Sequence, residues 1–211
     1  MHSGGAHGAD SDWTNAAEKY GIPNDPQHIS HYFSGFKSPK GNIEITQEEF
    51  NEGMNHVVIA DQTLHRLDNL SEDKTSSVYR LLARDWIQVK NSDAIFAIGT
   101  IKSGNIDGGT GWAVQMAKDV EKPIHIFDLN TEKWYTYDYD KKSFVVENTP
   151  KLTKNFAGIG SRSIDPEIEQ KTSKQKRPVK YIGDSKREAA LKAIDDVFSN
   201  TFGKVEETQS Q

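Results

Sequence analysis

The sequence predicts an α/β fold, a Rossmann-like parallel sheet with helices on both faces and a small β-hairpin. The continuous apolar run Ala94–Gly99 is typical of a strand buried on both faces, as the strands of parallel sheets are. A glycine-rich turn, a helix over 112–120 and a second apolar strand over 124–127 follow, which makes a βαβ unit with a right-handed crossover. A further strand, Phe156–Gly160, also runs into a glycine turn.

Amphipathic periodicity predicts the helices. Apolar side chains at i, i+3, i+4 and i+7 indicate a helix over 11–20, and Gly21 is a natural stop for it. Thr46, followed three residues later by Glu49, has the pattern of a capping box, so a helix is expected to open there. The remaining helices are expected over residues 78–90, 112–120 and 185–202.

The chain is expected to form one domain over residues 1–202. Aromatic residues alternate in part over 134–146, which predicts the hairpin. The polar, lysine-rich stretch 167–187 is expected to be a surface insert. Residues 203–211 lack apolar periodicity and are expected to be a disordered tail.

Composition argues against several classes of protein. The 211 residues include no cysteine, which rules out disulfides, thiolate nucleophiles and zinc fingers. The net charge of -5 argues against nucleic acid as a partner. No apolar run approaches the ~18 residues of a membrane helix, and the first residues have no signal-peptide pattern, so a cytoplasmic protein without a membrane partner is expected. His28 and His31 lack a third ligand at a matching spacing, so no metal site is expected. No cofactor is expected either.

Glycine-rich turns occur three times, at residues 3–10, 107–111 and 158–162, each where a strand is expected to lead into a helix. Ligands of open α/β sheets bind outside the carboxyl ends of the strands, and helix N-termini favour anions. Three such turns at one edge would therefore cradle phosphate groups. The alternative is that these glycines only end strands, since none of the turns has the Walker A or dinucleotide fingerprint. Two residues precede the first turn, so its strand is either very short or begins upstream of this sequence.

Four motifs carry a resemblance to a known family. They are SGGA-x-GAD at 3–10, the Arg84 helix with the strand after it, GGTGWAVQMA at 108–117 and FAGIGSR at 156–162. On these motifs the chain resembles the SLOG superfamily, which includes the LONELY GUY phosphoribohydrolases, the YpsA proteins and the nucleotide-binding domain of DprA. The last motif normally opens the family domain, so its late position indicates a circular permutation. The order is similar to that of an uncharacterised bacterial and phage group.

The resemblance implies a nucleotide-derived ligand, such as a nucleoside monophosphate or ADP-ribose, and allows a homodimer. In the phosphoribohydrolases of this family, a glutamate after the glycine turn supports cleavage of an N-glycosidic bond. Gln115 stands at that position here, Trp112 replaces a threonine, and the usual Arg-Lys pair is Arg84–Asp85. An amide can neither accept a proton nor carry the negative charge that stabilises an oxocarbenium-like centre. Whether the chain is an enzyme therefore stays open.

The candidate ligand-binding residues lie in and beside the three turns. Arg84 and Arg162 would neutralise phosphate charge, although a helical arginine is often only a solvated residue. Asp10 would cap a helix or bind a ribose hydroxyl, and His7 is either an exposed loop residue or a phosphate donor. Trp112 would stack on a base or belong to the core. The full set is Gly4, Gly5, His7, Gly8, Asp10, Arg84, Gly108, Gly109, Thr110, Gly111, Trp112, Gln115, Gly158, Gly160, Ser161 and Arg162.

The sequence supports three hypotheses about function. The first is binding or sensing of a nucleotide-derived ligand, with the phosphate on the turns and the base towards Gln115 and Trp112. The second is a nucleotide N-glycosidase, which needs a carboxylate in place of the missing glutamate. The third is a non-catalytic interaction protein with a vestigial pocket. The aspartates that could replace the glutamate are Asp10, Asp85 and Asp107.

Overall fold

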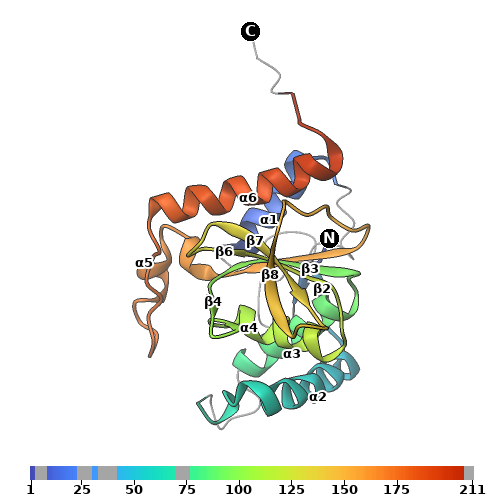
Figure 1. Ribbon diagram of the computed structural model, residues 1–211. Coiled ribbons are helices and arrows are strands. Elements are labelled where there is room, and N and C mark those ends of the chain that lie inside the picture. Colours follow the sequence, from blue (N-terminus) through green and yellow to red (C-terminus); the bar gives the residue numbers. More distant parts are fainter. Residues whose placement is uncertain (3–8, 23–29, 33–41, 70–76, 207–211) are drawn as a thin grey trace.

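The computed structural model describes residues 1–2, 9–22, 30–32, 42–69 and 77–206, which form a Rossmann-like α/β fold (Figure 1). Its centre is a five-stranded sheet with the strand order β8-β7-β6-β3-β9. The strands of this sheet are β3 (Ala94–Gly99), β6 (Ile124–Asp128), β7 (Lys133–Asp138), β8 (Ser143–Glu147) and β9 (Phe156–Gly160).

The middle of the sheet is parallel. β3 pairs in parallel with β6 on one side and with β9 on the other. His2 lies beyond β9: its N–H donates to the Phe156 carbonyl at 2.7 Å, and its carbonyl accepts from the Gly158 N–H at 2.9 Å. β3, α4 (Thr110–Asp119) and β6 form the predicted βαβ unit. Among the described residues, the strand before the first glycine turn is this single bridge at His2.

The predicted hairpin is present as β7 and β8, but it continues the central sheet. β7 pairs antiparallel with β6, and β8 pairs antiparallel with β7. The sheet is therefore mixed, with a parallel core and an antiparallel edge. The physical reason is Trp134 of β7, which is buried and packs edge-on against the Phe127 ring of β6 at a centroid distance of 5.7 Å. This contact holds the hairpin in the plane of the sheet.

Helices and short strands make up the rest of the described chain. None of the helices within the described ranges is both long and apolar enough to span a lipid bilayer. The helices are α1 (Ala9–Lys19), α2 (Gln47–Leu64), η2 (Leu67–Asn69), α3 (Ser77–Lys90), η3 (Arg162–Ile164), α5 (Ile168–Thr172) and α6 (Asp184–Phe202). The short strands are β1 (Ser30–Tyr32), β2 (Asn42–Glu44), β4 (Ile101–Lys102) and β5 (Asn105–Ile106).

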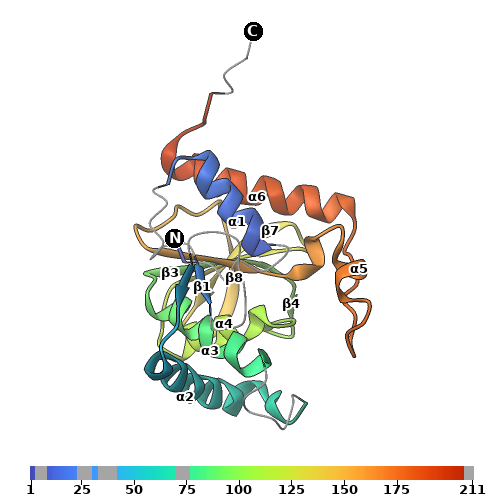
Figure 2. The same ribbon diagram turned by 180° about the vertical axis from the view of Figure 1, so that it is seen from behind.

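Helices cover both faces of the sheet, as predicted. Figure 1 shows α1 and α6 above the sheet and α3 and α4 below it, with α2 packed beneath α3 as a further layer, and Figure 2 shows the same layers from behind. On the upper face, Trp13 of α1 is fully buried, with its ring centroid 5.9 Å from Phe198 of α6 and 6.5 Å from both Phe96 and Phe156. This aromatic cluster joins α1, α6 and the sheet.

The helix ends follow the signals in the sequence. The capping box is formed: the Glu49 N–H donates to the Thr46 hydroxyl at 3.1 Å, and the Thr46 N–H donates to the Glu49 carboxylate at 3.2 Å. Gly21 follows α1 and Gly203 follows α6, both with the positive φ that favours glycine after a helix. The predictions for Thr46 and Gly21 are confirmed.

The lysine-rich stretch 167–187, expected to be a surface insert, is anchored to the rest of the fold at both ends. Ile168 and Thr172 of α5 are buried, and the Ile182 N–H donates to the Ser163 carbonyl at 2.9 Å. The side chains between these anchors, over 173–178, are exposed. Residues 204–206 have no regular structure, and 207–211 lie outside the described residues.

Gly53 is expected to be essential to the packing of α2 on α3. A Cβ atom there would lie 2.5 Å from the Ala83 carbonyl oxygen and 2.8 Å from its Cα. Gly53→Ala is therefore predicted to lower the free energy of unfolding by about 1–3 kcal/mol, although alanine favours helices by about 1 kcal/mol over glycine. Urea denaturation measures the change. The control Asn55→Ala, on the exposed side of α2, should leave stability unchanged or raised. A Gly53→Ala protein as stable as the wild type would contradict this packing.

Candidate functional site

Three parallel strands end side by side at one edge of the sheet, in the order β9, β3 and β6. The Ser161 N–H, just after β9, donates to the Ile98 carbonyl of β3 at 2.9 Å. The Ala9 N–H, the first of α1, donates to the Ser161 carbonyl at 3.2 Å. The N-terminus of α1 is therefore held against the carboxyl ends of β9 and β3.

Gly160 allows this close approach. A Cβ atom at Gly160 would lie 2.6 Å from the Ala9 Cβ and 2.5 Å from the Ile98 carbonyl oxygen. Any side chain would push the first turn of α1 away from the sheet. Its role in the structure is thus to bring a helix N-terminus to the strand ends.

A second helix, α4, begins at the same edge, after the loop that follows β3. Gly108 has φ +70°, a conformation that glycine adopts without strain. Gly109 is the N-cap of α4 and provides no side-chain cap. Among the described residues, no acceptor is bonded to the N–H groups of Gly109 and Thr110. These N–H groups and the positive end of the helix dipole favour an anion.

Arg66 fixes the orientation of this turn. Its guanidinium donates to the carbonyl oxygens of Gly108 and Ile106, both at 3.2 Å. The C=O and N–H of a trans peptide point in opposite directions, so the Gly109 N–H points away from Arg66. Gly111 leaves room for the contact, because a Cβ there would lie 2.7 Å from the Arg66 Nη1. Arg66 therefore holds the turn so that the Gly109 N–H points away from its side chain.

Asp61 holds Arg66 in place from the end of α2. Its carboxylate accepts the backbone N–H groups of Arg66 at 2.6 Å and Leu67 at 3.0 Å. Neither residue was predicted from the sequence, because nothing in the local pattern at 61–66 points to a turn some 40 residues later. Their roles depend on the tertiary packing of α2 on α4.

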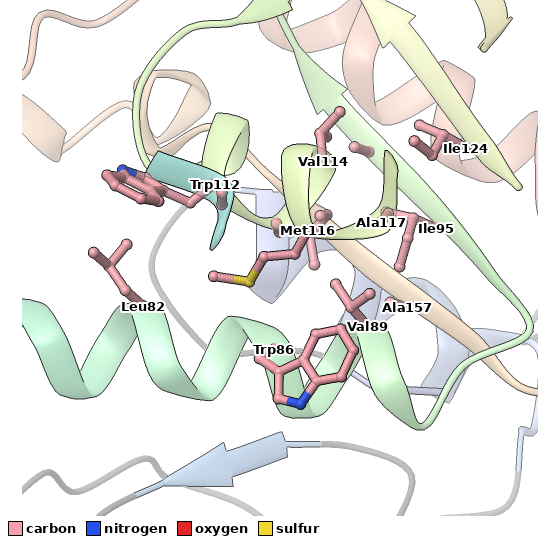
Figure 3. Close-up of a cluster of buried hydrophobic side chains, with 14 of the residues drawn as sticks. Leu82, Trp86, Val89, Ile95, Trp112, Val114, Met116, Ala117, Ile124 and Ala157 are labelled. Carbon is pink, nitrogen blue, oxygen red and sulfur yellow. The ribbon is translucent and has the colours of Figure 1, made fainter. Parts of the chain in front are cut away.

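Three residues expected to contact a ligand make contacts within the fold. Trp112 is only 4% exposed and lies in the core above Leu82 (Figure 3). Its indole belongs to the hydrophobic core, which is the arrangement that the core alternative for Trp112 predicts. Gln115 is buried and donates to the Asp119 carboxylate at 2.8 Å. Gly158 lies inside β9, where a Cβ atom would be 2.7 Å from the Trp13 ring, so this glycine accommodates the indole.

The remaining candidates are placed as follows. Ser161 is at the strand-end edge, but its hydroxyl accepts the Ser163 N–H at 3.1 Å and caps η3. Arg162 is the first residue of η3 and is exposed beside that edge. The first glycine turn lies outside the described residues, with its candidates Gly4, Gly5, His7 and Gly8.

Asp10, Arg84 and Asp85 interact electrostatically although they come from two helices. Asp10 is in the first turn of α1, and Arg84 and Asp85 are in the middle of α3. Asp10 is 8% exposed and Arg84 is 4% exposed. The carboxyl of Asp85 is desolvated, although the residue keeps some exposed surface. Its burial raises the pKa of Asp85 to about 7; Arg84 acts to lower this pKa and Asp10 to raise it.

Gln88 joins this polar face of α3 and was not predicted. It is 1% exposed and lies one helical turn after Arg84. Among the described residues, neither its amide oxygen nor its amide nitrogen has a hydrogen-bond partner. The spacing of Arg84 and Gln88, four residues apart, was a usable signal in the sequence, since it places both on one helix face. The burial was not visible there.

No protein-family model matches the chain, and neither a curated protein nor a solved structure matches it. In the part of the chain that the structure describes, no three histidine, aspartate or glutamate side chains gather as metal ligands. The chemistry of the site therefore has to follow from its glycine turns, its helix N-termini and the polar face of α3.

The Asp85 carboxyl is expected to make stability depend on pH. The folded protein binds this proton more tightly than the unfolded chain, where the pKa is about 3.8, so the contribution of Asp85 to stability falls as pH rises from about 4 to about 7. Asp85→Asn removes this titration. The unfolding free energy of the Asp85→Asn protein minus that of the wild type should therefore increase between about pH 5 and about pH 8, by a few kcal/mol at most.

Urea denaturation of both proteins at the two pH values measures this difference. Asp68→Asn is the control, because it removes an exposed carboxyl in η2. A difference between Asp85→Asn and wild type that does not change with pH would show that Asp85 is not held protonated.

Proposed function

We propose that the protein binds or senses a nucleotide-derived ligand of the nucleoside monophosphate or ADP-ribose type. Its phosphate would lie on the turn Gly108–Thr110. The observation that carries this proposal is that α1 and α4 both begin where neighbouring parallel strands end. Anionic ligands of open α/β sheets bind at such an edge, on the N–H groups of helix N-termini.

The backbone of the turn supports a phosphate in particular. The Gly109 and Thr110 N–H groups are successive donors, and the Arg66 clamp directs the first of them outward. Thr110 adds a hydroxyl at the first position of α4. The space beside Gly109 is open to an anion, since a Cβ atom there would meet nothing within 4 Å. Backbone donors of this kind are worth more than solvated side chains, since they are fixed before the ligand binds.

Positive charge near this edge supports the same ligand. Arg162 is exposed directly after β9, and the guanidinium of Arg66 contacts the turn itself. A cation next to the N-terminus of α4 is unfavourable with respect to the helix dipole. A bound anion would offset that repulsion by interacting with both.

The strand order supports a relationship to the SLOG superfamily through a circular permutation. β9 carries FAGIG, the motif that opens the family domain, and lies between His2 and β3 in the sheet. A strand late in the chain thus lies between β3 and the bridge made by the second residue of the chain. This is the arrangement that joining the old termini and opening the chain before SGGA would give.

Cleavage of an N-glycosidic bond is a second candidate function, favoured by Asp85. A general acid works best when its pKa is close to the operating pH, and burial raises the pKa of Asp85 to about 7. Gln115, at the position of the family glutamate, is bonded to Asp119 and has no acid–base chemistry. In such an enzyme Asp85 would protonate the leaving base.

Incubation with nucleoside monophosphates, NAD and ADP-ribose, followed by liquid chromatography and mass spectrometry, separates these functions. Intact nucleotide retained by the protein is the expected result for a binding or sensing module. Release of free base by the wild type, lost in Asp85→Asn, would establish the hydrolase instead. A protein that neither retains nor cleaves any of these compounds would contradict both functions.

A charge placed at Gly109 is expected to abolish binding without damaging the fold. Gly109 has φ −63° and open space at its Cβ position, so Gly109→Ser and Gly109→Asp both fit. An acid there interacts favourably with the α4 dipole by about 0.3–1 kcal/mol, so the thermal stability of the free Gly109→Asp protein should be unchanged or raised. Its carboxylate occupies the proposed phosphate position, and binding should weaken at least about tenfold in calorimetric titration.

Gly109→Ser is the matched control, because it adds a side chain of similar length without charge. It should keep most of the affinity. Equal binding by Gly109→Asp and wild type would place the phosphate elsewhere.

A further inference from the structure

The central sheet ends on one side at β8, whose outer edge carries backbone groups that the sheet does not use. Among the described residues, β7 is the only strand paired with β8, and the pairing covers all five residues of β8. In an antiparallel pair, the N–H and C=O groups of alternate residues point toward the partner strand, and the others point away from it. Every second residue of β8 therefore directs a donor and an acceptor out of the sheet.

The sequence of β8 lacks the features that usually protect an edge strand. Soluble proteins place lysine, proline or a bulge at such an edge, because an exposed edge pairs with other chains. β8 reads Ser-Phe-Val-Val-Glu, with neither lysine nor proline, and its unbroken register leaves no bulge. Its phenylalanine and valines are residues that favour pairing, and Val146 is 56% exposed. The edge therefore has the composition of a strand that pairs on both sides.

The opposite edge of the sheet, along β9, is partly covered within the molecule. His2 donates to the Phe156 carbonyl and accepts from the Gly158 N–H there. A contact between β8 of one molecule and β9 of the next would join two different surfaces, and such contacts propagate into filaments. Pairing of β8 with itself closes about a two-fold axis, which requires the two strands to be antiparallel, and the assembly then ends at two copies.

We propose that β8 pairs antiparallel with β8 of a second copy of this chain, with Val145 on the two-fold axis. Val145 then faces Val145 of the second copy. On the face of the sheet that α4 covers, Phe144 lies opposite Val146, an aromatic and β-branched pair that covers the exposed valine. At the two ends Ser143 lies opposite Glu147, so its hydroxyl can donate to the carboxylate. Each side chain of the strand thus meets a suitable partner in the same strand of the other copy.

The charges at the two ends of β8 favour the same arrangement. Lys141 and Lys142 directly precede the strand, and Glu147 ends it. Antiparallel pairing brings the basic start of each copy to the acidic end of the other. Lys141 lies two residues before Ser143, so it becomes a diagonal neighbour of Glu147 in the second copy, within reach of a long side chain. The carboxylate is already fixed at the edge, because its Oε1 contacts the His125 Nδ1 at 2.6 Å.

Opposite charges placed at Ser143 test this pairing, because Ser143 is exposed in the single chain and faces Glu147 of the second copy. Ser143→Lys sets a cation opposite the carboxylate and should tighten the dimer. Ser143→Glu sets two carboxylates opposite each other and should weaken it. Each pair occurs twice by symmetry, so the dissociation constant should change by about three- to tenfold in each direction. Sedimentation velocity over a series of protein concentrations measures the dissociation constants.

Ser173 provides the matched control, since it is an exposed serine at the end of α5. Ser173→Lys and Ser173→Glu make the same changes in charge away from β8 and should leave the dissociation constant of the wild type unchanged. A wild type that sediments as a monomer at every concentration would overturn the proposal. A dimer that responds equally to the substitutions at both serines, or to neither set, would also overturn it.

Cross-linking provides a second readout, because the chain has no cysteine of its own. Val145→Cys places the two new thiols opposite each other on the axis, close enough to form a disulfide between the copies when an oxidant is added. Val120→Cys is the control, since this valine is 42% exposed at the end of α4. Val145→Cys should form the covalent dimer much faster than Val120→Cys does. Equal rates for the two variants would contradict the assigned axis.

Discussion

β3 is buried along its whole length and hydrogen-bonded to a strand on each side, and the rest of the structure is arranged around it. Its parallel partners β6 and β9 have to end where it ends. The chain after each of them therefore leaves from one edge of the sheet. Gly99 and Gly160 let the following segments pack closely on the strand ends. A Cβ at Gly99 would lie 2.9 Å from Ile106, and one at Gly160 would meet Ala9. Two helix N-termini reach the same edge as a result.

Charged groups near this edge are unfavourable for the free protein in two places. Arg66 lies beside the positive end of α4, where the helix dipole repels a cation. The Asp85 carboxyl is desolvated and experiences the charge of Asp10 in the first turn of α1. We propose that a bound anion offsets the first of these by interacting with both Arg66 and the helix N-terminus.

The sequence predicts the fold more completely than the site. The apolar run of β3, the glycine turn before α4 and the Thr46 capping box are local patterns, so the βαβ unit and the helices follow from them. The hairpin is also predicted, but its place in the sheet depends on the Trp134 contact with Phe127. Trp112 could be a core or a base-stacking residue on periodicity alone. Arg66 clamps a turn 42 residues away, which local spacing does not encode.

The central claim is that the strand-end edge binds the phosphate of a nucleotide. Selective 15N labelling of the 16 glycines, with amide NMR during titration with adenosine monophosphate, tests it most directly. The account predicts large shifts for Gly108 and Gly109 at the N-terminus of α4, and none for Gly21 or Gly203 at the far ends of α1 and α6. Saturable binding that leaves Gly108 and Gly109 unshifted would contradict the account.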